Sequence, residues 1–300
     1  MYNKETTKIR PLVLGTAVNY NWEQLAAFVL SCKRHIPEVK IVLFVSNIDL
    51  DTIEKLEKEN VKVIIDSFNK YPNFVGWRLP LHQIRLKLSI IIAKLITNGL
   101  KSDENEPYVN AFSSVVIQRF YRYLRFIEIY GKHYSHIILT DTRDVIFQSN
   151  PFPLNGLHLF GEKNEKIGES HFAKRWFQLS YGTKTWKELG NKPLLNVGTT
   201  LGDTSSVLNY LSLVTNEFNR ILSFFWGADT SVHNFIAYKK VHNPVINKFG
   251  QGVVITLHGV KLNQLILDKG KILNSNGIPF SIVHQYDRVK DLILTDLMQK

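Results

Sequence analysis

The sequence is poor in cysteine and contains no long apolar run. Its 300 residues include a single cysteine, Cys32, so an internal disulfide is excluded and no structural zinc site is indicated. No stretch reaches the roughly 20 apolar residues that a membrane span requires. Residues 1–11 carry charges but lack the apolar core of a secretory signal. The composition therefore predicts a protein of a reducing compartment, and we expect it in the cytoplasm.

The chain also lacks patterns that would indicate other classes of function. It has no internal repeat and no low-complexity tract. Residues 15–20, GTAVNY, do not form the Gly-rich basic loop that is typical of nucleotidyltransferases after their first strand. No recognition-helix or zinc-finger pattern is present, so we expect no sequence-specific binding to nucleic acid.

The formal net charge of +11 predicts an anionic partner. Nucleotide-sugars, phospholipid headgroups and nucleic acids all fit this charge, which ranks none of them first. Peripheral contact with an anionic membrane surface is therefore one expectation. Lysine and arginine are spread along the chain rather than gathered in a tail, and many of them are typical of solvated faces.

Strand and helix patterns alternate along the first 66 residues. Short runs of Val, Ile and Leu alternate with amphipathic stretches. We expect strands at residues 11–18, 40–46 and 60–66, and helices at residues 22–36 and 51–59. Strands that alternate with helices form parallel sheets with right-handed crossovers. The sequence therefore predicts an α/β fold, with a mostly parallel, Rossmann-like sheet flanked by helices.

No change of composition divides the chain, so we expect a single domain over residues 1–300. A helical insertion is expected near residues 67–112, because residues 81–96 are long and apolar. Residues 101–108, KSDENEPY, are charged and turn-forming, and we expect them to form a loop.

An expected helix at residues 114–130 carries Arg119, Arg122 and Arg125. Arginines three residues apart lie on one stripe of a helix. Such a stripe is typical of a solvated face. Arg119 is the member that we expect to contact an anionic ligand.

The most informative segment is residues 136–152, HIILTDTRDVIFQSNPF. An apolar run of strand character ends there in two carboxylates, Asp141 and Asp144. In open α/β sheets the carboxyl ends of buried strands border the ligand crevice. Mg²⁺ and Mn²⁺ take oxygen ligands and commonly share them with substrate phosphates. The segment therefore predicts a site for a metal and a diphosphate.

Two later segments carry further candidate residues. In the expected strand at residues 195–203, Asn196 and Gly198 face the same side. An amide can hold a sugar hydroxyl and a glycine permits close approach of a ligand, although a glycine bulge in a core strand explains the pair more simply. Asp229 lies at the start of an expected helix, either as its N-cap or as a residue that reaches a ligand.

Near the C-terminus a strand-like run ends in a polar cluster, HQYDR. Within it, His284 offers an imidazole ligand for a metal and Arg288 offers a planar guanidinium for a phosphate. A histidine after a strand is also common as a purely structural residue, so the two interpretations are equally weighted.

These motifs and their order resemble GT-A glycosyltransferases with a D-x-D-type metal motif. The order is similar to family 8, the glycogenin and lipopolysaccharide galactosyltransferase group. The pattern D-x-R-D-V-x-F-Q-x-x-P-F followed by H-Q-Y-D-R also resembles a set of little-characterised GT-A proteins. The resemblance runs from residue 12 to Arg288 and is anchored at four motifs. It implies a GT-A fold and a nucleotide-diphosphate-sugar donor, with a UDP-sugar expected.

The resemblance also implies roles for the matching residues. Asp141 would contact the donor ribose and the metal, which would be Mn²⁺ or Mg²⁺. Asp144 and His284 would bind the same metal. Asn196 would hold the donor sugar, and Asp229 would lie near its anomeric carbon as a catalytic residue.

Other residues would complete the donor site by the same resemblance. Gly15, Thr16 and Ala17, near the end of the first strand, would line the nucleotide base and ribose. Independently of the resemblance, Arg119 and Arg288 offer cationic groups for the donor diphosphate, and Gly198 permits close approach of the donor.

The sequence departs from the family pattern at three places. Two residues separate the acids instead of one, so an alternative makes Asp141 the principal metal ligand and places Asp144 beside Arg143. The H-x-x-G-x-x-K-P-W ending is absent, which leaves Arg288 or Lys290 to replace its phosphate-binding lysine. Asp229 is followed by threonine where the family has glutamine.

We therefore expect a metal-dependent hexosyl- or pentosyltransferase, and a retaining one because no general base is evident. Its acceptor is unknown and could be a glycan, a lipid-linked molecule or a protein. The alternative is a nucleic-acid-associated or catalytically degenerate GT-A-like binding protein. Aromatic residues within 171–186 are expected to form an ordinary hydrophobic patch, with an acceptor platform as the alternative.

Overall fold

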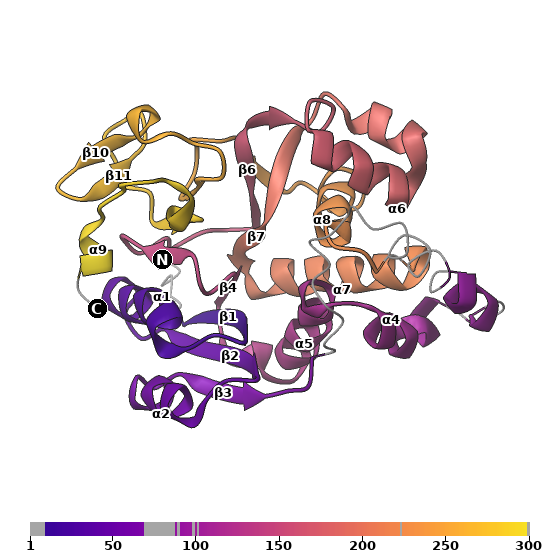
Figure 1. Ribbon diagram of the computed structural model, residues 1–300, viewed down its shortest axis with the longest axis horizontal. Helices are drawn as coiled ribbons and strands as arrows, with labels where there is room; N and C mark the ends of the chain where they lie inside the picture. The colour runs from indigo at the N-terminus through magenta and orange to yellow at the C-terminus, as the bar shows by residue number, and fades with distance from the viewer. Residues whose placement is uncertain are drawn as a thin grey trace, which may run out of the picture.

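The computed structural model describes residues 10–68, 88, 91–97, 100, 102–222 and 224–298. Its centre is a seven-stranded mixed sheet (Figure 1). The strands of this sheet are β1 (Pro11–Val18), β2 (Lys40–Ser46), β3 (Lys62–Ile65), β4 (His136–Thr140), β6 (Leu157–Lys166), β7 (Pro193–Asp203) and β8 (Val245–Asn247).

The spatial order of the strands is β3-β2-β1-β4-β7-β6-β8. The pairs from β3 to β4 are parallel, as is the pair of β6 with β8. β7 runs antiparallel to both of its neighbours, β4 and β6. The predicted α/β fold with a mostly parallel sheet is therefore confirmed.

Helices cover both faces of the sheet (Figure 1). The helices are α1 (Trp22–His35), α2 (Leu50–Lys58), α4 (Glu106–Phe112), α5 (Val115–Tyr130), α6 (His171–Leu189), α7 (Thr204–Ile221), α8 (Ala228–Lys239) and α9 (Thr295–Met298). Short 3₁₀ helices lie at η1 (Ser102–Asn105), η2 (Gly131–His133), η3 (Leu262–Gln264) and η4 (Tyr286–Arg288). Within the described part of the chain, none of the helices is both long and apolar enough to cross a membrane.

Alternation along β1 divides the core between the two faces of the sheet. Leu12 and Leu14 belong to a cluster that includes side chains of α5, α7 and α8. Val13 and Ala17 face the other way, into a cluster with side chains of α1 and α2. Because both faces are covered, the central strands are continuous apolar runs, as their sequences indicate.

The predicted loop at residues 101–108 was wrong. Ser102–Asn105 form a 3₁₀ helix and Glu106 begins α4, with Pro107 in its first turn. Proline favours a turn but is equally suited to the first turn of a helix, where its missing N–H is not needed. The helical insertion expected near residues 67–112 is described only in part. Residues 88 and 91–96 are helical, whereas residues 69–87, 89–90, 98–99 and 101 lie outside the described residues.

A second, smaller sheet joins the C-terminal part of the chain to the segment that follows β4. It consists of β5 (Val145–Phe147), β12 (Ile282–His284) and β9 (Val254–Thr256), with β12 in the middle. A hairpin of β10 (Ile266–Asp268) and β11 (Lys271–Leu273) follows β9 in the chain (Figure 1).

The buried side chain of Gln148 fastens β5 to this C-terminal part. Its amide group donates to the carbonyl oxygens of Ile272 and Phe280, at 3.1 and 2.8 Å, and its Oε1 accepts from the N–H of Ile272 at 2.9 Å. The five polar atoms that meet here, two of the Gln148 amide and three of the main chain, need partners once they are buried.

Replacing Gln148 by alanine should therefore lower the free energy of unfolding by about 3 kcal/mol, because buried backbone groups lose their partners. Urea unfolding followed by circular dichroism measures this change. Gln251→Ala, at an exposed position, is the control and should stay near the parent. A loss no larger than that of the control would contradict the role of Gln148.

Candidate functional site

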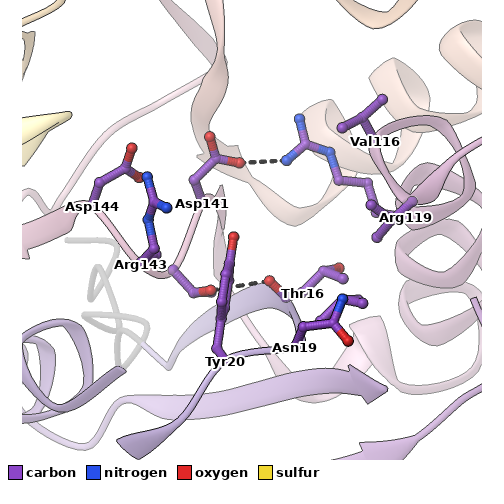
Figure 2. A pocket seen from close by; sticks show the side chains of 11 residues that line it. Thr16, Asn19, Tyr20, Val116, Arg119, Asp141, Arg143 and Asp144 are labelled. Atoms are coloured by element: carbon purple, nitrogen blue, oxygen red, sulfur yellow. Dashed lines mark hydrogen bonds and ion pairs between the residues drawn. The ribbon is translucent and has the colours of Figure 1, made fainter. Parts of the chain in front are cut away.

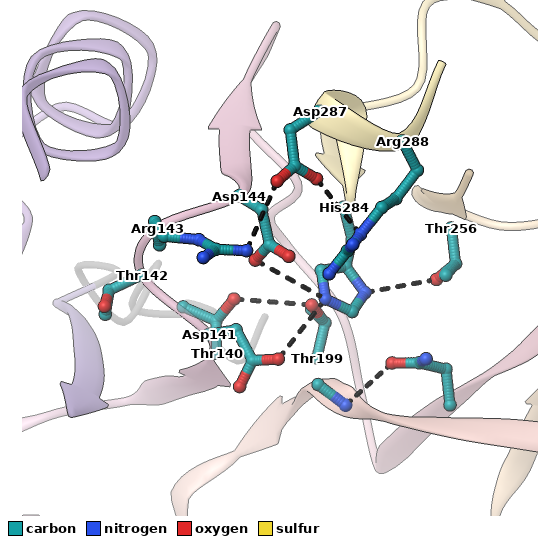
Figure 3. A network of polar contacts seen from close by, with 12 residues as sticks. Thr140, Asp141, Thr142, Arg143, Asp144, Thr199, Thr256, His284, Asp287 and Arg288 are labelled. Carbon is teal, nitrogen blue, oxygen red and sulfur yellow. Dashed lines mark hydrogen bonds and ion pairs between the residues drawn. The ribbon is translucent and has the colours of Figure 1, made fainter. Parts of the chain in front are cut away.

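Two carboxylates flank the turn between β4 and β5. Asp141 directly follows β4, and its N–H donates to the carbonyl oxygen of Gly198 on β7 at 2.8 Å. Asp144 directly precedes β5. The antiparallel register that pairs His284 with Val145 brings the end of β12 to the same place. The structure thus unites Asp141, Asp144 and His284, whose ligand atoms all lie within 4.8 Å of one another (Figure 3).

His284 is oriented as a metal-binding imidazole would be. Its ring is almost fully buried, and its Nδ1 lies 3.4 Å from the hydroxyl of Thr256. Its Nε2 lies 3.4 Å from Asp141 Oδ2 and 3.9 Å from Asp144 Oδ1, and has no hydrogen-bond partner. Metal-bound histidines are commonly held in this way through their other ring nitrogen.

Gly198 lies directly beneath the side chains of Asp141 and His284. A Cβ atom at this position would lie 2.4 Å from Cε1 of His284 and 2.7 Å from Oδ2 of Asp141. The space next to the trio therefore exists because residue 198 has no side chain.

The charges around this site are unevenly balanced. Burial opposes ionisation of Asp141, but Arg119 and His284 outweigh it and hold the pKa of Asp141 well below its usual range. Burial raises the pKa of Asp144, and the neighbouring Asp141 adds to that effect. Burial alone would lower the pKa of His284, yet the surrounding carboxylates raise it. Two carboxylates, and an imidazole nitrogen without a hydrogen-bond partner, could together hold a divalent cation.

Arg119 lies between two carboxylates of the site. Its guanidinium is ion-paired with Asp141 (Figure 2). It also lies 3.6 Å from the carboxylate of Asp229. The other two arginines of the α5 stripe have different partners, since Arg122 pairs with Asp66 and Arg125 with Glu106. Arg143 forms an ion pair with Asp287, in which Nη2 and Oδ2 lie 3.3 Å apart, and its charge also acts to lower the pKa of Asp144.

A first pocket, of about 210 Å³, opens beside the acids (Figure 2). It is lined by Thr16, Val18, Asn19, Tyr20, Val115, Val116, Arg119, Asp141, Thr142, Arg143 and Asp144. Thr16 thus lies at the site, whereas Ala17 is packed in the core and Gly15 lies beneath Thr142. Tyr20, an aromatic residue two positions after the end of β1, was not among the predicted site residues.

A second, wider pocket of about 420 Å³ shares Val116, Arg119 and Asp141 with the first. Asn196, Gly198, Asp229, His284 and Arg288 also line it. The first and second pockets therefore bring together most of the residues that the sequence singled out, from segments far apart in the chain.

Glu162 is a further acid of the wider pocket, and the sequence analysis missed it. It lies on β6 beside Asn196, and burial raises its pKa. The signal was present, because Glu162 follows the apolar run LHLF much as Asp141 follows its own apolar strand. Asn196 itself is held by its Oδ1, which accepts from the N–H of Gly198 at 2.7 Å.

Asp229 lies in the first turn of α8, and Gly227, not Asp229, is the N-cap. The helix is fixed to β7 by Asn234, whose amide group exchanges two hydrogen bonds with the main chain of Leu195, both of 2.9 Å. Burial raises the pKa of Asp229 to about 6, although Arg119 works against that shift.

Asp229→Asn should make the protein more stable, and more so at high pH. The folded state holds the proton of Asp229 more tightly than the unfolded chain, so stability is lost as pH rises through the folded pKa. Removing the carboxylate should therefore increase the free energy of unfolding by about 3 kcal/mol at pH 7.5 but by only about 1 kcal/mol at pH 4.5.

Urea unfolding in EDTA at the two pH values measures this difference. Asp268→Asn, at an exposed carboxylate, is the control and should show no such dependence. An equal gain for Asp229→Asn at both pH values would show that its carboxyl is not perturbed.

Comparison with known proteins gives a fold but no sequence family. No family model matches the chain, and no curated protein sequence matches it. Its structure is similar to that of an active-site mutant of LgtC, with a TM-score of 0.50 and 12% identity over 92% of this chain and 87% of that one. The galactosyltransferase LgtC with donor and acceptor sugar analogues gives a TM-score of 0.46 and 11% identity over the same shares of the two chains. The chain has the GT-A glycosyltransferase fold.

Proposed function

We propose that this protein is a metal-dependent glycosyltransferase that takes a sugar from a nucleoside-diphosphate donor, with UDP as the expected nucleotide. One observation carries the proposal. Asp141, Asp144 and the unpartnered Nε2 of His284 meet at the carboxyl end of β4, beside two connected pockets. The GT-A fold supports the same class of reaction, although a fold alone does not fix a function.

The donor set favours Mn²⁺ or Mg²⁺. It offers carboxylate oxygens and one imidazole nitrogen, and no thiolate. A cation held by these residues would neutralise negative charge on the leaving nucleoside diphosphate. Gly198 leaves the space that such an ion needs, because any side chain there would enter the site.

The first pocket is suited to the nucleotide. The ring of Tyr20 offers an aromatic face to a base, and burial raises the pKa of its hydroxyl, which stays protonated. Thr16 and Asp141 are placed to contact the ribose. Arg288 borders the wider pocket, where a guanidinium can pair with phosphate oxygens.

The sugar would then lie in the wider pocket. Asn196 supplies amide groups for hydroxyls, and Asp229 and Glu162 supply carboxylates. Arg119 links the two parts of the site, because it contacts both Asp141 and Asp229. We also propose that the reaction retains the configuration of the anomeric carbon. Proton NMR of the first-formed product distinguishes the two anomers. An inverted product would indicate that Asp229 or Glu162 acts as a general base.

If the proposal is right, UDP should stabilise the protein only when Mn²⁺ is present. At about 100 times its Kd, a ligand of the folded state adds about 2.7 kcal/mol, which a thermal unfolding scan detects. Asp144→Ala and His284→Ala should each lose this Mn²⁺-dependent shift, because each removes a metal ligand.

Asp268→Asn removes an exposed carboxylate outside the site and should keep the full shift. An undiminished Mn²⁺-dependent shift in both ligand variants would refute the metal site. No shift with any nucleotide in the parent protein would favour the catalytically degenerate binding protein.

A further inference from the structure

Three aromatic side chains, Phe172, Trp176 and Trp226, line the wider pocket. We call them the aromatic wall. Phe172 and Trp176 lie four residues apart on α6, and their rings stack with centroids 5.8 Å apart and planes inclined by 27°. Trp226 meets Trp176 edge-on, with centroids 5.3 Å apart. The wall is therefore one continuous surface built from two segments of the chain.

The wall is left open to solvent. Phe172 is 60% exposed and Trp226 is 44% exposed. Exposed aromatic rings that adjoin one another and border a pocket commonly mark a binding surface.

The structure holds the wall in a fixed position beside Asp229. Ala173 and Phe177, on a neighbouring stripe of α6, are fully buried and anchor that helix. Trp176 packs against Gly227, where a Cβ atom would lie 2.2 Å from its ring and where φ is +91°. Gly227 is also the N-cap of α8, whose first turn carries Asp229. The wall and the acid are thus joined through Gly227.

The chemistry of the pocket fits a sugar better than an alkyl chain. Aromatic rings pack against the C–H face of a pyranose ring, while its hydroxyls need polar partners. The same pocket supplies such partners, because Glu162, Glu165 and His258 line it with the wall. An alkyl chain would leave these groups desolvated without hydrogen bonds, which is costly.

We propose that the aromatic wall binds a glycosyl unit of the acceptor, so that the acceptor is a carbohydrate or a molecule that ends in one. The inference rests on the proposed function and names the substrate class that this function requires. Trp226 lies three residues before Asp229 in the chain, so a sugar on the wall lies next to the residues assigned to the donor sugar.

Saturation-transfer difference NMR tests this inference without knowledge of the true acceptor. The probes are methyl β-D-glucopyranoside, methyl β-D-galactopyranoside, methyl α-D-mannopyranoside, N-acetylglucosamine, lactose, cellobiose and maltose, with decanoate as the alkyl probe. We expect saturation of ring protons in at least one saccharide. Phe172→Ala and Trp226→Ala should each weaken that saccharide about tenfold, which corresponds to 1.4 kcal/mol.

Three controls accompany the test. Leu179→Ala removes an exposed apolar side chain from the same helix and should bind the saccharide like the parent. Phe172→Trp keeps an aromatic face and should restore binding. The Mn²⁺-dependent stabilisation by UDP should be unchanged in all variants, since the wall does not line the first pocket.

The outcomes separate this inference from the proposed function. Saturation of decanoate alone, or of no probe at all, would overturn the inference even if UDP still binds. Equal saccharide binding in Phe172→Ala, Trp226→Ala and the parent would overturn it too. Saccharide binding that depends on the wall, without any response to nucleotides, would support the wall as a sugar site and refute the nucleotide-sugar donor.

Discussion

The placement of negative charge in the cleft is the constraint on which the rest of the structure depends. Asp141, Asp144, Glu162 and Asp229 line connected pockets, and burial works against the ionised form of each. Carboxylates this close repel one another unless cations intervene. Arg119 lies against Asp141 and Asp229 and acts to lower the pKa of both, whereas His284 and Arg143 act in the same direction on Asp144. The cluster of Asp141, Asp144 and His284 could also bind a metal ion, which would add positive charge at the same place.

The topology of the two sheets brings Asp141, Asp144 and His284 together. β4 delivers Asp141 at its carboxyl end, and the turn that follows delivers Asp144 at the start of β5. β12 then returns from the far end of the chain and pairs with β5, which puts His284 opposite. Gln148 and Asn234 act in the same way on either side of the site, since each ties a site-bearing segment to the main chain of a distant one.

Local sequence patterns predicted the strands and strand ends, which depend mainly on neighbouring residues. Apolar runs predicted the parallel strands, and the abrupt change from ILT to DTRD located the strand end at which Asp141, Asp144 and His284 meet. The loop expected at residues 101–108 failed because one proline fits both a turn and a helix start. Tyr20, Glu162 and the aromatic wall were missed or left undecided for a different reason. Glu162 follows an apolar run as Asp141 does, but its place beside Asn196 depends on tertiary contacts. The places of Tyr20 and of the aromatic wall beside the two pockets depend on tertiary contacts in the same way.

The site depends on a single glycine, Gly198, as much as on its polar side chains. The main chain of β7 runs so close to Asp141 and His284 that the space beside them exists only because residue 198 has no Cβ atom. The three polar side chains alone therefore do not make the site. A variant that keeps Asp141, Asp144 and His284 but carries a side chain at residue 198 would lose the space next to Asp141 and His284.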